Sequence, residues 1–157
     1  MALTKEQIAT DYPLPVYNYR VNIADTTIAF SEVSGLDIGF DPITYKESQV
    51  ADGKAGPNIM YMPGMITEVN ITLKKGLVKA KSVPVLYEWI NSTALNRIDK
   101  RDITVSLCDE TGTPVVTWKV IDAFPTKLTA PTFDANSNEV AVEQMELRAS
   151  SVSMEEN

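Results

Sequence analysis

The sequence predicts an all-β protein with one inserted helix, in which two antiparallel sheets pack together as a sandwich or barrel. Three observations support this fold class. Apolar and polar residues alternate along several segments, one segment has helical periodicity instead, and no linker divides the chain. The length of 157 residues suits one domain, so we expect residues 1–157 to form a single domain with its own core.

The alternation is clearest in residues 17–23, 68–74 and 102–107. In each segment every second residue is apolar, which is the pattern of a strand with one buried and one solvated face. The solvated face of the second strand carries four polar side chains: Glu68, Asn70, Thr72 and Lys74. This wet face either lines a water-filled channel or faces bulk water.

The second half of the chain continues the same pattern. Asp109-Glu110-Thr111-Gly112 is a turn signal, and it precedes a further strand over residues 115–121, so the sequence predicts a hairpin here. Cys108 lies at the end of the strand before this turn and is predicted to be an ordinary strand residue. Along residues 137–153 the apolar phase changes near Glu143, which predicts a long strand with a bulge at that point.

Residues 82–91 have a different period. Ser82 is a candidate N-cap and Pro84 lies in the first turn, which favours a helix start. Leu86, Trp89 and Ile90 then form one apolar stripe at helical spacing. The segment predicts a helix of about three turns that covers the core, with Trp89 packed inside.

Residues 46–64 show no sustained period and contain three glycines and two prolines. We expect an extended loop, longer than most connections in a compact domain. Its second half contains four consecutive apolar residues, Ile59, Met60, Tyr61 and Met62. Such a cluster favours packing on a neighbouring subunit over a loop that folds back on its own domain.

Composition excludes several function classes. The chain has no histidine and one cysteine, which removes histidine bases and most zinc sites, so we expect no enzyme activity, no metal and no cofactor. A net charge of −7 argues against specific nucleic-acid binding. No apolar run is long enough to cross a membrane, and the first residues lack the features of a signal peptide. We therefore expect synthesis in the cytoplasm.

Several segments together resemble the tube proteins of contractile tails. Near the start these are Glu6-Gln7-Ile8 and Tyr12-Pro13, and they are followed by residues 30–36, 62–64, 71–76 and 87–91. The run over residues 123–135, with residues 137–142 after it, is more particular. It is similar to the inner-tube proteins of extracellular contractile injection systems, of the antifeeding prophage and Photorhabdus virulence cassette type, within the contractile phage tail tube superfamily.

This resemblance implies a ring-forming structural protein. Six subunits would join into a ring, and stacked rings would form a rigid inner tube that a contracting sheath drives through a target envelope. The implied partners are further copies of the chain, the sheath protein, spike and baseplate proteins, and protein payload in the lumen. The particle would assemble in the bacterial cytoplasm and act outside the cell.

Two alternatives to the injection particle stay open at this point. The first is the tail tube of a contractile bacteriophage, which has the same fold and passes DNA. The second is a soluble β-sandwich binding module, which would be a monomer.

Overall fold

The computed structural model describes residues 2–49, 53, 55–80 and 82–157. Most of the chain is β-structure, with two short α-helices and one π-helical segment. In chain order the elements are α1 (Lys5–Asp11), β1 (Tyr19–Ile23), β2 (Thr26–Ile28), β3 (Glu32–Ser34), β4 (Phe40–Glu47), β5 (Asn58–Ile66), β6 (Val69–Gly76), the π-helix (Val83–Tyr87), α2 (Glu88–Asn91), β7 (Arg101–Cys108), β8 (Pro114–Thr129), β9 (Val142–Ala149) and β10 (Ser151–Glu156).

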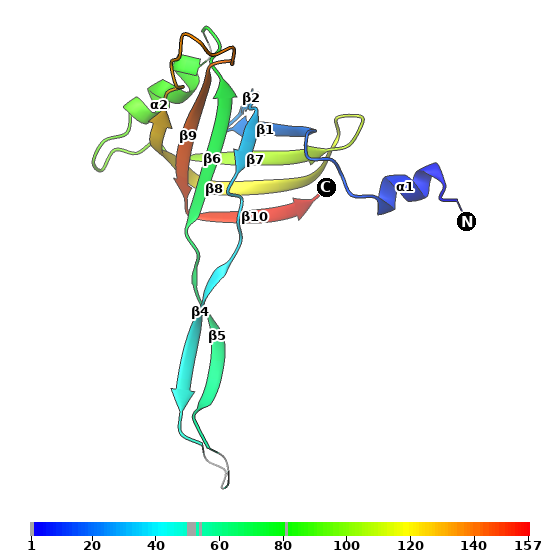
Figure 1. The fold of residues 1–157 in the computed structure, drawn as a ribbon, viewed down its shortest axis with the longest axis vertical. Helices are drawn as coiled ribbons and strands as arrows, with labels where there is room; N and C mark the ends of the chain where they lie inside the picture. The colour runs from blue at the N-terminus through cyan, green and yellow to red at the C-terminus, as the bar shows by residue number, and fades with distance from the viewer. Residues whose placement is uncertain (1, 50–52, 54, 81) are drawn as a thin grey trace.

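Eight of the strands form one antiparallel sheet, in the order β2-β1-β7-β8-β9-β6-β3, with β10 also paired to β8. The prediction of two separate sheets is therefore wrong in one respect, although two layers do pack face to face. Figure 1 shows β6 and β9 crossing in front of β7 and β8. Among the described strands the hydrogen-bonded path ends at β2 and at β3, so the single chain does not close a barrel.

The 16-residue strand β8 joins the two layers. Its first half pairs with β7 and β10, and its second half pairs with β9. Asp122 lies between the halves with a φ of 55°, a left-handed conformation that Asp tolerates better than most residues. Its backbone N–H donates to the Asp102 carboxylate over 3.0 Å. This irregular position lets one strand change partners and bend the sheet.

The core lies between the two layers and under α2. Its buried apolar side chains are Val21, Ile23, Val69, Ile71, Leu73, Leu86, Trp89, Ile103, Val105, Val120, Ala123, Met145 and Leu147. The Trp89 ring is 1 % exposed, its indole N–H donates to the Asp99 carbonyl over 2.7 Å, and the Arg101 guanidinium lies 4.8 Å from its centre. The predicted packing role of Trp89 is confirmed.

The prediction of a single helix needs correction. The inserted helix begins where expected, but residues 83–87 are π-helical and the regular α-helical part is short. A second helix, α1, precedes the sheet and was not predicted. Its N-terminus has a capping box in which the Thr4 hydroxyl accepts from the Gln7 N–H and the Gln7 side chain accepts from the Thr4 N–H. Figure 1 shows α1 extending away from the body.

The predicted strands and the hairpin between β7 and β8 are confirmed. In the turn, the Asp109 carboxylate accepts hydrogen bonds from the Thr111 hydroxyl and from the backbone N–H groups of Thr111 and Thr113. Cys108 is a buried strand residue. The long strand predicted over residues 137–153 is wrong in its extent, because residues 137–141 lie outside any strand and the chain breaks at Ser150 between β9 and β10. The bulge expected near Glu143 is also wrong, because β9 pairs regularly with β6 there.

Candidate assembly surfaces

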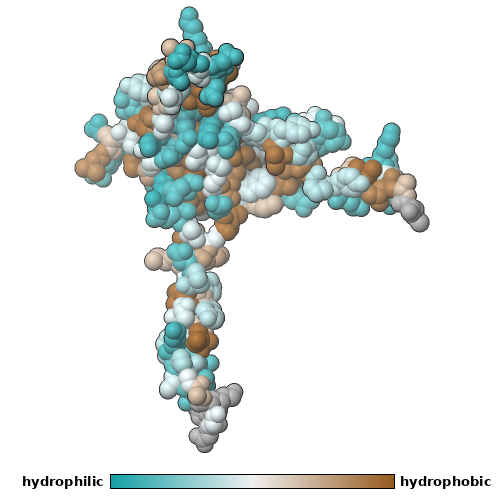
Figure 2. All heavy atoms as spheres, viewed as in Figure 1, coloured by the Kyte–Doolittle hydropathy of each residue, from teal (hydrophilic) through white to brown (hydrophobic). Residues whose placement is uncertain are grey.

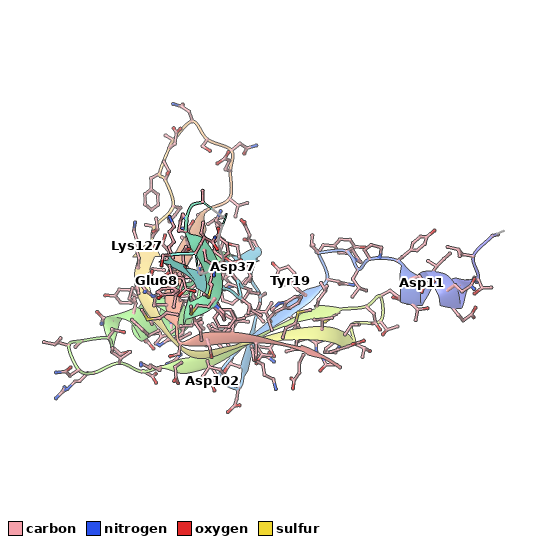
Figure 3. The ribbon with its side chains drawn as sticks, turned by 90° about the horizontal axis from the view of Figure 1, so that it is seen from below. Asp11, Tyr19, Asp37, Glu68, Asp102 and Lys127 are labelled. Atoms are coloured by element: carbon pink, nitrogen blue, oxygen red, sulfur yellow. The ribbon has the colours of Figure 1, made fainter. Side chains whose placement is uncertain are left out.

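A broad polar face covers the outer side of the β3–β6–β9 layer. Along β6, Val69, Ile71 and Leu73 point into the core, while Asn70, Thr72 and Lys74 point outward with Glu68 just before the strand. Figure 3 shows Glu68 and Lys127 toward one side of the body and Asp102 toward the other. The four residues that the sequence grouped as a wet face thus share one surface.

Neighbouring strands extend this surface, which we call the polar face. Residues paired across antiparallel strands point to the same side, so the register assigns the members from β3, β9 and β8. Beside the β6 residues the polar face contains Glu32, Ser34, Gln144, Glu146, Arg148, Lys127 and Thr129. The same register places two apolar residues on it, Phe124 opposite Arg148 and Val142 opposite Gly76. The sequence reasoning found only the β6 part, because alternation within one strand does not reveal which other strands lie beside it.

The polar face is balanced in charge although the whole chain is acidic. It carries three acidic residues, Glu32, Glu68 and Glu146, and three basic residues, Lys74, Lys127 and Arg148. The Lys74 amine lies 3.1 Å from the Glu32 carboxylate, and the Arg148 guanidinium lies 2.6 Å from the Glu68 carboxylate. The net charge of −7 is therefore carried elsewhere on the chain and not by the polar face.

The segment predicted as an extended loop over residues 46–64 is largely an exposed β-hairpin. Strands β4 and β5 pair from Phe40↔Ile66 to Glu47↔Asn58, with an irregularity between Phe40 and Pro42, so residues 58–63 lie in a regularly paired strand. Figure 1 shows this hairpin projecting away from the body. At about 3.4 Å per residue, the eight residues of β4 span about 25 Å. Part of the predicted loop, residues 50–52 and 54, lies outside the described residues.

The structure divides the predicted cluster Ile59, Met60, Tyr61 and Met62 between two faces of the hairpin. Met60 pairs with Tyr45 and Met62 pairs with Ile43, so these four apolar residues share one face. Ile59 pairs with Lys46 and Tyr61 pairs with Thr44, so the other face is mixed. No described residue of β4 or β5 is buried. Brown patches along the hairpin and α1 in Figure 2 show that apolar residues are exposed on both projections.

The pKa values of two ionisable groups in the described part of the chain are shifted, and both shifts have structural causes. Among the described residues no three His, Cys, Asp or Glu side chains gather as a metal site. Hydrogen bonds, above all from the Thr111 hydroxyl, lower the pKa of Asp109, and burial followed by the nearby Glu32 charge raises the pKa of Tyr19. Both shifts follow from local structural contacts. No helix in the described part of the chain is long and apolar enough to span a membrane.

Comparison with protein families places these surfaces in context. The family described as T4-like virus tail tube protein gp19 matches residues 15–153, which is most of the chain. The chain belongs to this tail tube protein family. Family membership makes the tube protein a structural protein, in agreement with the expectation of no enzyme activity.

Solved structures support the same relationship. A chain in the sheath–tube complex of the PVC extracellular contractile injection system, in its extended state, is 44% identical to the tube protein, with a TM-score of 0.89 over 99% of this chain and 100% of that one. A chain in the anti-feeding prophage cap is also 44% identical, with a TM-score of 0.85 and complete coverage of both chains.

A more distant structural likeness concerns the fold alone. Hcp1 from Flavobacterium johnsoniae is 19% identical, with a TM-score of 0.52 over 90% of the tube protein and 97% of that chain. The comparison with curated protein sequences gives no match. The resemblance expected from the sequence is confirmed at the level of the tube protein family of these injection particles.

Proposed function

We propose that this chain is the subunit of the rigid inner tube of an extracellular contractile injection particle. Rings of six copies stack into a hollow tube, and contraction of a surrounding sheath drives the tube through a target envelope. The observation that carries the proposal is the 44% identity over 99% of the chain to a component of a sheath–tube complex. The similar chains in cap and baseplate structures support contacts with end structures of the particle.

The polar face is the surface that suits the wall of the channel. It contains charged and polar side chains, lies opposite the apolar core, and carries equal numbers of acidic and basic residues. A wall without net charge neither traps nor repels a cargo according to the sign of its charge. We propose that the cargo is a protein payload. A wall of this kind would let the payload pass without binding it specifically.

Accessibility of introduced cysteines tests the placement of this face. Thr72 lies on the polar face and Thr104 on the outer side of β7, and both are half-buried threonines within strands. In assembled tubes, Thr72→Cys should react with a small maleimide but slowly with a bulky polymer-linked maleimide, whereas Thr104→Cys should react with both. Equal reaction of both variants with the bulky reagent would place the polar face on the outside.

Assembly itself is tested with the purified chain. We expect size-exclusion chromatography and negative-stain microscopy to show rings and, at higher concentration, tubes. A protein that stays monomeric at every concentration would contradict the proposal. Replacing Ile59, Met60, Tyr61 and Met62 together by Ser should leave the body folded and impair stacking, because these side chains contribute nothing to the core.

The tail tube of a contractile bacteriophage is the second candidate, because the matching family is described from a T4-like virus. Purified native particles separate the two. Protein without DNA in the lumen supports the injection particle, and DNA in the lumen supports the phage tail. The third possibility, a monomeric binding module, is set aside by membership of the tube family.

A further inference from the structure

The body has an apolar groove that the second layer leaves uncovered. The inner face of β1, β7 and β8 consists of successive rows across the strands. The row Ile23–Ile103–Val120 is buried under the second layer. One row further along, Trp118 is half-exposed, and the next row, Tyr19–Leu107–Val116, is half-exposed throughout.

The apolar face of the core therefore continues beyond the strands that cover it. Tyr19, Leu107 and Trp118 from the partly exposed rows line a groove of about 790 Å³, together with Ile28 and Phe30 from the edge of the body. The lining includes no described residue of the β4–β5 hairpin. Tyr19 closes one side of the groove, because its hydroxyl donates to the Phe30 carbonyl over 2.6 Å. The Tyr19 hydrogen bond fixes this wall of the groove, and no other part of the described chain fills it.

The hairpin carries the complementary surface. On one face Ile43, Tyr45, Met60 and Met62 form two adjacent apolar pairs, each side chain between 39% and 49% exposed. Seven cross-strand pairs fix the hairpin, so binding it orders little additional chain. A soluble monomer gains nothing from exposing four large apolar side chains on one face of a hairpin, about 10–17 Å from its base.

The hairpin also keeps its direction in an assembled relative. Residues 40–66 are about a sixth of the chain. The TM-score of 0.89 to a chain of the extended sheath–tube complex could not be reached if this sixth pointed elsewhere. A projecting hairpin is thus a feature of the assembled state and not a consequence of viewing one chain alone.

We propose that the apolar face of the hairpin, made of Ile43, Tyr45, Met60 and Met62, inserts into the groove at Ile28, Leu107 and Trp118 of a second copy of this chain. This rests on the proposed function and names the contact between copies. A projecting donor and a separate acceptor on every subunit make a heterologous interface, which continues from copy to copy as a ring or helical stack requires.

The N-terminal arm is the competing occupant and is less suited. None of the side chains of α1 is buried. The arm offers two apolar side chains on one side, Ile8 and Tyr12, whereas the hairpin offers four on one face. The arm also starts at the groove itself, since Val16 and Tyr17 belong to its lining. In Figure 3 the arm leaves the body beside Tyr19, so its direction is set at the groove edge.

Crosslinking between differently labelled subunits tests the contact. Met60→Cys and Ile28→Cys variants are mixed, assembled and treated with a short bismaleimide; the native Cys108 is buried, and the wild-type chain controls for it. We expect a crosslinked dimer only in the mixture of the two variants. Absence of that dimer in assembled tubes, or a dimer formed instead by Ile8→Cys with Ile28→Cys, would overturn the proposal.

Tryptophan fluorescence gives a second measurement on the unmodified chain. Trp89 is already buried, whereas Trp118 is half-exposed in the groove, so assembly should shift the emission to shorter wavelength through Trp118 alone. The shift should disappear in Trp118→Phe. An unchanged emission in wild-type tubes would show that the groove stays empty.

The two faces of the hairpin provide a matched control. M60S/M62S should raise the critical concentration for assembly about tenfold or more, and I59S/Y61S, on the opposite face, about threefold or less. Equal effects would contradict the assignment of the face. Tubes that form without the crosslink or the fluorescence shift would refute only this contact, whereas a wild-type chain that never assembles would refute the proposed function.

Discussion

Gly35 lies directly after β3, where the chain crosses close to the backbone of β6, and its φ is +89°. A Cβ atom at this position would lie 2.0 Å from the Asn70 carbonyl oxygen and 3.1 Å from the Ile71 Cα. All the near atoms belong to the backbone, and Ile71 is fully buried in the core, so β3 and β6 must move apart to accept alanine. Gly35→Ala should therefore destabilise the fold.

The loss of stability in Gly35→Ala has two parts, and a second glycine, Gly112, allows them to be measured separately. Gly112, in the turn between β7 and β8, has a similar φ of +82°, but a Cβ there would meet no atom within 4 Å. The left-handed backbone costs a non-glycine residue about 1–2 kcal/mol at either position. Gly35→Ala adds overpacking, which costs about 1–3 kcal/mol in a packed region. The difference between the two variants measures the close approach alone.

Thermal and urea unfolding, followed by circular dichroism, would measure both variants under conditions where the chain is dissociated. We expect Gly35→Ala to lose about 1–3 kcal/mol more stability than Gly112→Ala, with a midpoint lower by several degrees. The effect of alanine on the unfolded chain is common to both and cancels. Equal stability of the two variants would refute the reasoning that β3 and β6 are in close backbone contact at Gly35.

Three further outcomes follow from other contacts. Trp89→Phe should cost about 2–3 kcal/mol in urea unfolding, because it removes the indole hydrogen bond to the Asp99 carbonyl and leaves a cavity where the larger ring was buried. The pKa of Asp109 is lowered, first by the hydrogen bond from the Thr111 hydroxyl. The stability that the ionised carboxylate contributes at neutral pH should therefore be lost as the pH falls through the pKa of Asp109 in the folded state. In an acid titration followed by circular dichroism, Asp109→Asn should lack this loss. Gly64→Ala puts a Cβ 2.4 Å from the Asp41 carbonyl at the hairpin base, and should abolish tubes in micrographs while the unfolding midpoint of the body changes little.

Much of the body could be predicted because burial on one side imposes a period of two. β6 follows the alternation from Val69 to Leu73. Lys75 and Glu143, which pair across β6 and β9, are charged residues at buried positions, and this is why the phase seemed to change near Glu143. The inserted helix was predicted from the spacing of Leu86 and Trp89, both of which are buried. The bend in β8 was not, because a single Asp122 in a left-handed conformation has no periodic signal.

The hairpin and α1 were missed for a related reason. A strand that is exposed on both faces has no binary pattern, so Ile59 to Met62 read as an apolar cluster within a loop. Helix α1 has no buried face, and its apolar residues Ile8 and Tyr12 are too few to form a periodic pattern. One local signal was present, since Thr4 and Gln7 stand at the spacing of a capping box just before the helix. Patterns caused by burial within one chain do not report surfaces that another chain buries.

The groove shows the same limit from the opposite side. Tyr19, Leu107 and Trp118 each have the correct phase for a core residue, and alternation alone says nothing about how far the covering layer extends. The chain thus has two uncovered apolar surfaces. One is the groove, whose side chains point inward like core residues but are not covered by the second layer, and the other is the apolar face of the hairpin. The two surfaces are different and lie on the same subunit. When the hairpin of one copy fills the groove of a second copy, the hairpin of that second copy is still free to bind a third. Association of this kind does not stop at a dimer unless it closes on itself, and a stack of rings is the arrangement in which nearly every donor and acceptor is occupied.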